Sequence, residues 1–182
     1  MSLLQTAALE ATRAVLWTRT DTRNALLCSL VPGAVAATSF ATFAFNEGVV
    51  KWWADIHKPK WSIENIRISS AVDLSTILPL GFSSYLVYKY GDGYTVSALS
   101  IYGINMFLNL VKIPLAKSRD LLMLCKTSVL VHITALTMAF SFYRIEAVAG
   151  LLVLPYTFWT GYHALLAHWI HSTHADKPKK DL

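Results

Sequence analysis

Charged residues are scarce in this sequence. They make up 15% of its 182 residues, whereas hydrophobic residues make up 54%, and the mean hydropathy is +0.44. This balance excludes an ordinary soluble domain, in which about a quarter of the residues are charged. Only two cysteines are present, Cys28 and Cys125. Both fall in or beside apolar segments, so neither a disulfide scaffold nor a metal site is expected.

Recognisable catalytic patterns are also missing. The sequence has no Ser-His-Asp order, no carboxylate pair and no phosphate-binding loop. Little chain remains outside the long apolar segments, which excludes a separate soluble catalytic or nucleic-acid-binding domain. We therefore expect no required cofactor and no nucleic-acid partner.

Five apolar segments are each long enough to cross a membrane as a helix, which takes about 20 residues. They span residues 26–45, 68–88, 94–115, 121–143 and 147–170. Because lipid leaves only helices or closed barrels as spanning structures, and segments of this length exclude strands, we predict an all-α membrane protein. Residues 26–170 form a five transmembrane helix bundle, 1–25 an N-terminal segment that could be an interfacial helix, and 171–182 a basic tail.

Positive charge differs between the two predicted membrane faces. With five spans the termini lie on opposite sides, and cytosolic loops carry the excess of Lys and Arg. We therefore expect the C-terminus and residues 52–61 to be cytosolic, although Arg13, Arg19 and Arg23 on the other side oppose this orientation. The more basic side holds Lys51, Lys58, Lys60, Arg67, Lys117, Arg119, Lys177, Lys179 and Lys180.

The connection between the first two predicted spans is rich in tryptophan. Residues 52–61 read Trp-Trp-Ala-Asp-Ile-His-Lys-Pro-Lys-Trp. Indoles favour the boundary between hydrocarbon and water, and lysines favour lipid head groups. We expect this segment to lie on the bilayer surface or over the mouth of a cavity.

This segment resembles the signature Trp-Tyr-x-x-Leu-x-Lys-Pro-x-Trp of the translocator protein family, also called tryptophan-rich sensory proteins or peripheral benzodiazepine receptors. The spacing is unbroken, and the resemblance covers roughly residues 30–170. The matching residues are Trp52, Trp53, Ile56, Lys58, Pro59 and Trp61, followed by Gly81, Tyr85, Leu86, Val87, Leu108, Asn109, Leu152, Pro155, Tyr156 and Trp159.

The sequence also departs from the family. Ser62 and Ile63 stand where the family usually has Pro-Pro, and Asp73 falls near the position in the second span where the family usually has a tryptophan. Lys112 and Leu110 replace an aromatic pair in the third span. A pocket of the same architecture is implied, but not the same ligand preference.

The resemblance implies a membrane receptor for apolar ligands: porphyrin or haem, cholesterol or another sterol, and benzodiazepine-type drugs. Trp61 and Trp159 would contact rings, Asn105 and Asn109 would be polar anchors, and Trp53 and Pro59 would shape a lid with Trp52. In the fifth span Tyr156, Trp159 and His163 fall at i, i+3 and i+7, so their rings share one helix face.

Two charged residues lie deep in predicted spans. Asp73 lies about two turns inside the second span, where an ionisable group needs a partner. Asn105, Asn109 and Lys112 share a face of the third span. We predict an Asp73–Lys112 ion pair facing the bundle interior; the alternative is that both side chains extend separately to the interface. His132, in the middle of the fourth span, is expected to be a neutral hydrogen-bonding group between helices.

We expect a binding protein rather than an enzyme, with the bilayer and a sterol or tetrapyrrole ligand as partners. The sequence leaves open a porphyrin-degrading enzyme, a proton-coupled transporter using Asp73, Lys112 and His132, and a homodimer. Family resemblance implies the mitochondrial outer membrane, whereas lysines 179 and 180 resemble a retrieval signal for the endoplasmic reticulum.

Overall fold

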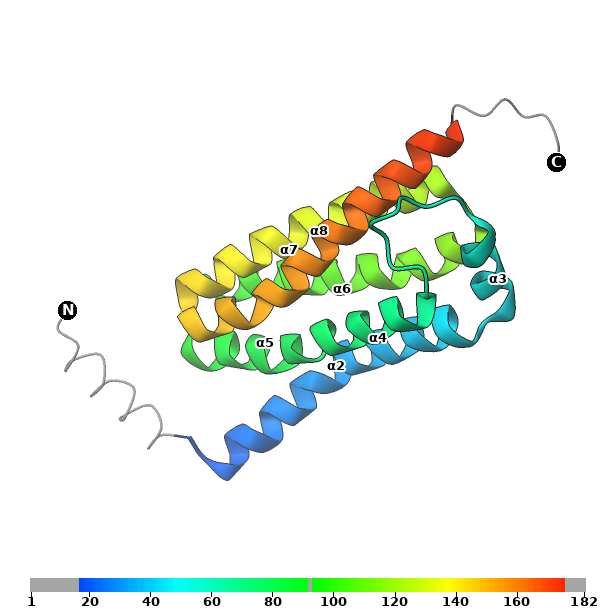
Figure 1. Ribbon diagram of the computed structural model, residues 1–182. Helices are drawn as coiled ribbons and strands as arrows, with labels where there is room; N and C mark the ends of the chain where they lie inside the picture. Colours follow the sequence, from blue (N-terminus) through cyan, green and yellow to red (C-terminus); the bar gives the residue numbers. More distant parts are fainter. Residues whose placement is uncertain (1–16, 92, 176–182) are drawn as a thin grey trace.

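The described part of the chain is helical, which confirms the predicted all-α class (Figure 1). The computed structural model describes residues 17–91 and 93–175. The predictions for residues 1–16 and 176–182 therefore lie outside the described residues. The helices are α2 (Arg19–Phe45), α3 (Glu47–Asp55), α4 (Ile66–Ile77), α5 (Pro79–Tyr90), α6 (Thr95–Ser118), α7 (Leu121–Ile145) and α8 (Ala147–Ala175).

Within the part of the chain that the structure describes, four helical units are long and apolar enough to cross a membrane. They are α2, the combined α4 and α5 (Ile66–Tyr90), α6 and α7. The fifth long helix, α8, has 29 residues and lies beside α7 in the same bundle (Figure 1). The predicted second span is divided where α4 ends and Pro79 starts α5, because proline has no N–H to continue the backbone ladder.

Short polar side chains set several of the helix boundaries. Asn46 ends α2 and accepts a hydrogen bond from Val49 N at the start of α3 (3.1 Å). Asn65 caps α4 and Asp120 caps α7 in the same way. Each cap satisfies a backbone donor that has no partner inside its helix. The connections between the helices are short, except for the one between α3 and α4.

The end of the bundle remote from α3 is held by an ionic cluster. Thr18 and Asp21 form a capping box at the start of α2. Asp21 also accepts a hydrogen bond from Tyr85 and lies 2.9 Å from Lys89 Nζ. Residues 19–25, predicted to belong to the N-terminal segment, are therefore the first two turns of α2, and they are joined to α5.

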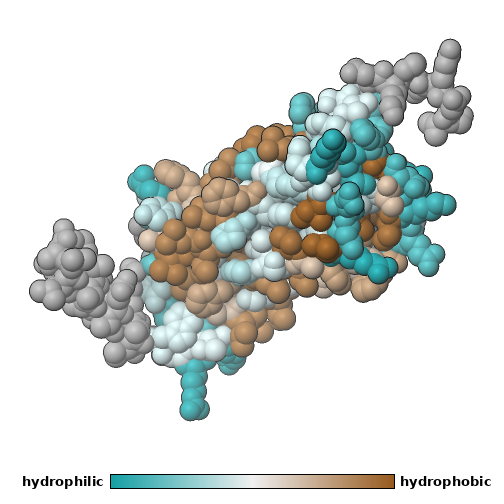
Figure 2. Space-filling model, viewed as in Figure 1, coloured by the Kyte–Doolittle hydropathy of each residue, from teal (hydrophilic) through white to brown (hydrophobic). Residues whose placement is uncertain are grey.

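The interior of the bundle is mostly apolar. α7 and α8 make the most extensive contact, α6 covers α7, and α2 packs on α4 and α5. Leu80, Val131, Met138 and Phe142 are fully buried where these helices meet. Many large apolar side chains of the outer surface are exposed, and Figure 2 shows them over the middle of one face, with polar side chains at the end that holds α3. Such a surface suits lipid rather than water.

A candidate ligand cavity beneath α3

A cavity opens at the end of the bundle that α3 covers. The cavity itself holds about 90 Å³, and its empty space is about 700 Å³ when the open solvent at the mouth is included. Every long helical unit contributes to the wall, but the second unit does so only through α4. The lining residues are Phe43, Trp52, Trp53, Ile66, Ser69, Ser70, Asp73, Lys112, Leu121, Leu124, Ser128, His163, Leu166, Ala167 and Ile170.

The tryptophans of α3 form one wall of this cavity. Trp52 and Trp53 are half-buried, with their ring centroids 6.2 Å apart. They pack on a small apolar cluster made by Ile56 with Leu166 and Ile170 of α8. The segment predicted as a loop therefore begins as a helix, whose apolar face places both indoles over the cavity.

Residues 56–65 cross from α3 to α4 without helical structure and run beside α8 (Figure 1). Trp53 Nε1 donates to Glu64 O at 3.1 Å, and Ile63 N donates to the Tyr162 hydroxyl at 2.9 Å. Lys58 Nζ donates to the carbonyls of Trp53 and Ile56. Burial lowers the pKa of Lys58, and the charges of Glu64 and Asp55 oppose this shift. These bonds fix the segment where the family usually has Pro-Pro.

We expect Tyr162→Phe to loosen this segment, because it removes the acceptor for Ile63 N. A hydrogen bond contributes about 0.5–1.5 kcal/mol, so trypsin cleavage after the exposed Lys60 should accelerate roughly three- to tenfold where local opening limits access. The matched control is Tyr143→Phe, because Tyr143 is exposed on α7. Equal cleavage rates in both variants and the parent would contradict the anchoring role.

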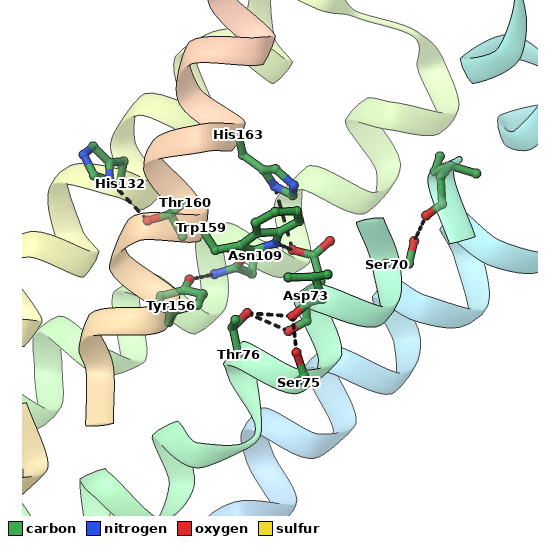
Figure 3. Close-up of polar contacts among 12 residues, drawn as sticks. Ser70, Asp73, Ser75, Thr76, Asn109, His132, Tyr156, Trp159, Thr160 and His163 are labelled. Carbon is green, nitrogen blue, oxygen red and sulfur yellow. Dashed lines mark hydrogen bonds and ion pairs between the residues drawn. The ribbon is translucent and has the colours of Figure 1, made fainter. Parts of the chain in front are cut away.

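The polar groups of the cavity gather around Asp73. Its Oδ1 accepts a hydrogen bond from Trp159 Nε1 at 2.7 Å and lies 3.8 Å from His163 Nδ1 (Figure 3). Lys112 lines the same cavity, as the predicted stripe requires. However, within the described residues no contact of 4.0 Å or less joins Lys112 to Asp73. The predicted direct ion pair is therefore not formed, and the Asp73 carboxylate accepts the indole N–H of Trp159 through Oδ1.

The predicted polar anchors lie elsewhere, in the bundle core. The Tyr156 hydroxyl donates to Asn105 Oδ1 and accepts from Asn109 Nδ2, both at 2.7 Å. Asn105 Nδ2 also donates to Val131 O at 2.9 Å and contacts Thr134. Neither asparagine nor Tyr156 lines the cavity. Their polar atoms bond to one another and join α6, α7 and α8, which is a packing role.

Trp61 does not point into the bundle, contrary to the expectation that it contacts a ligand ring beside Trp159. It is 52% exposed and meets the edge of Tyr162, with ring centroids 5.8 Å apart. Tyr162 in turn stacks on Trp159 at 4.8 Å, and so separates the two indoles. Pro59 is buried but does not line the cavity.

His132 also lies outside the cavity. It shares a shallow outer groove with Trp61 and Phe158. Its Nδ1 lies 3.2 Å from Thr160 Oγ1 (Figure 3), which fits the predicted hydrogen bond between helices. A relay through Asp73, Lys112 and His132 is therefore not assembled.

Of the predicted ligand-contacting residues, the structure brings Trp53 and His163 to the cavity, together with Asp73 and Lys112. Sequence reasoning assigned Trp52 to the lid and missed the serines of α4. Ser69, Ser70 and Asp73 form a polar run at i, i+1 and i+4 within an apolar helix, and this signal could have identified α4 as a cavity wall.

Long apolar helices around a cavity near one end define a multi-pass helical membrane protein with an internal cavity. The family model for the TspO/MBR family matches residues 25–171, and the chain belongs to this family. No curated protein matches the chain. In general terms, the family indicates a membrane role in binding sterols or porphyrins.

Proposed function

We propose that the protein is a five-span membrane receptor that binds a flat, largely apolar ligand, of the porphyrin or sterol class, in the cavity beneath α3. In this arrangement α8 is the fifth crossing, and the C-terminus and α3 face the cytosol. The organelle is the mitochondrial outer membrane or the endoplasmic reticulum. Benzodiazepine-type drugs are also flat and largely apolar, so the proposal includes them as ligands.

The observation that supports this function most strongly is the composition of the cavity wall. Trp52 and Trp53 offer indole faces for stacking, and the remaining wall is mostly leucine, isoleucine and phenylalanine. A few polar groups, those of Asp73, Lys112 and His163, lie at one place on this wall. Small-molecule sites combine a large apolar surface with a few convergent polar groups in this way.

Titration of the purified protein with protoporphyrin tests the proposal. The reporter should be the porphyrin absorption band, because its signal does not depend on the number of tryptophans left. We expect saturable binding, and Trp52→Ala should raise the dissociation constant about tenfold, since a lost aromatic contact costs about 1–2 kcal/mol. The matched control is Trp61→Ala, which removes an indole outside the cavity and should leave affinity unchanged.

Absence of saturable binding, or equal losses in both variants, would reject this cavity as the site. Repeating the titration under illumination distinguishes binding from turnover. A stable porphyrin band in the light fits a receptor, whereas progressive loss of the band that requires Trp52 would indicate a porphyrin-degrading enzyme.

A further inference from the structure

We propose that Lys112 makes the cavity selective for amphipathic ligands that carry an acidic head group. This inference rests on the binding function proposed above and assigns the ligand's charge. Lys112 belongs to α6, and its side chain lines the cavity together with Asp73 and His163.

The ammonium group of Lys112 has no direct counter-charge. Among residues 17–91 and 93–175, no hydrogen bond or ion pair within 4.0 Å is formed by its Nζ atom. The Asp73 carboxylate acts on it electrostatically from a greater distance. Asp73 itself is engaged by the Trp159 indole and lies near the His163 ring. Among the described residues, Lys112 is therefore a cation of this cavity without a bonded partner, and it is available to a ligand.

The surroundings of Lys112 make such a ligand group favourable. Most of the wall that Lys112 shares is apolar, and Phe43, Leu121 and Leu124 offer no hydrogen-bond acceptor on their side chains, while the Asp73 carboxylate lies more than 4.0 Å from the ammonium group. A charge among apolar groups in a membrane protein is costly unless it is partnered. Charge-assisted hydrogen bonds between an ammonium and a carboxylate or phosphate are among the stronger polar contacts. An acidic head group would supply this partner while the apolar body of the ligand lies against the indoles.

The positions of Lys112 along α6 and of Asp73 along α4 are consistent with this mode of binding. Lys112 lies six residues before the end of α6, so it is about 9 Å from that end at 1.5 Å per residue. Asp73 lies seven residues after the start of α4, at a similar depth. A ligand could therefore enter beside α3 and place its head group near the cavity mouth without crossing the bundle.

Matched pairs of probes measure the effect of charge at constant shape. Protoporphyrin IX is compared with its dimethyl ester, and cholesteryl hemisuccinate with cholesterol, in the same detergent. For each variant the ratio of the two dissociation constants is recorded. We expect the parent protein to prefer the acid about tenfold or more, and Lys112→Met to lose this preference through weaker binding of the acid. Lys112→Arg, which keeps the charge, should retain most of the preference.

The charge-matched control is Lys126→Met, because Lys126 is an exposed lysine of α7 outside the cavity. It removes the same net charge, so an equal change there would overturn the assignment by showing a general surface effect. Equal affinities of acid and neutral probes in the parent would also overturn it, while leaving the cavity as a binding site. Stronger binding of an amine analogue of cholesterol than of the hemisuccinate would also overturn the assignment. It would indicate that Asp73, not Lys112, determines which charge the ligand carries. If no probe binds, both the proposed function and this inference fail.

Discussion

Replacing Gly81 by alanine should lower the melting temperature of the detergent-solubilised protein by roughly 2–12 °C, since overpacking costs about 1–3 kcal/mol and each kcal/mol shifts the melting temperature of a chain of this size by about 2–4 °C. A Cβ atom on Gly81 would lie 2.3 Å from the Cα of Ser29 and 2.7 Å from its Oγ. The Cα of Ser29 is a backbone atom, so it cannot rotate away from the added methyl group as a side-chain atom can. α2 would therefore have to move away from α5 at this contact.

Gly103→Ala is the matched control for this prediction. Gly103 lies within α6, and a Cβ atom there would meet nothing within 4 Å. Alanine has the higher helix propensity, so this variant should be as stable as the parent or slightly more stable. Equal destabilisation by both substitutions would show that the close contact of α2 and α5 does not limit stability.

Tyr156→Phe should be the second strongly destabilising substitution, at about 1–3 kcal/mol, because it removes two buried hydrogen bonds that each contribute about 0.5–1.5 kcal/mol. The hydroxyl both donates to Asn105 and accepts from Asn109, and the side chain is 1% exposed. Thermal unfolding monitored by circular dichroism measures the loss. Tyr88→Phe, which changes a tyrosine that is 67% exposed, should have little effect.

The same variant distinguishes a packing role from the anchoring role predicted from sequence. Because Tyr156 and both asparagines lie outside the cavity, protoporphyrin affinity should be unchanged at temperatures where Tyr156→Phe is folded. A fall in affinity comparable to that of Trp52→Ala would show that the network binds ligand. In a double-mutant cycle with Asn109→Leu, the stability losses should not add, because the two side chains share one hydrogen bond.

The helices of the bundle could be predicted from sequence because their hydropathy and length reflect the thickness of a bilayer. Helical periodicity also placed Asp73 and Lys112 on the same cavity. Periodicity could not identify the partner of Asp73. Trp159 is distant in sequence, and it binds Asp73 through a neutral hydrogen bond where the charged Lys112 was expected. Periodicity likewise gathered Asn105 and Asn109 correctly, but it did not show that Tyr156 would bind both.

The position of Trp61 could not be predicted from the tryptophan-rich signature. Its exposure depends on the path of residues 56–65, which is set by the Tyr162 hydroxyl and by the bond from Trp53 to Glu64. The α3 helix was missed for a related reason: its tryptophans resembled an interfacial loop, although Asn46 is a good cap for a helix starting at Glu47.

The break before Pro79 divides the second membrane crossing into two units under different constraints. α4 supplies cavity residues such as Ser69 and Asp73, whereas no residue of α5 lines the cavity. α5 instead carries Gly81, whose close approach to Ser29 restricts its substitution. With the cavity as the proposed binding site, changes in α4 would alter ligand preference while α5 preserves the scaffold. Randomising the cavity face of α4 alone is then the way to seek binders of new ligands.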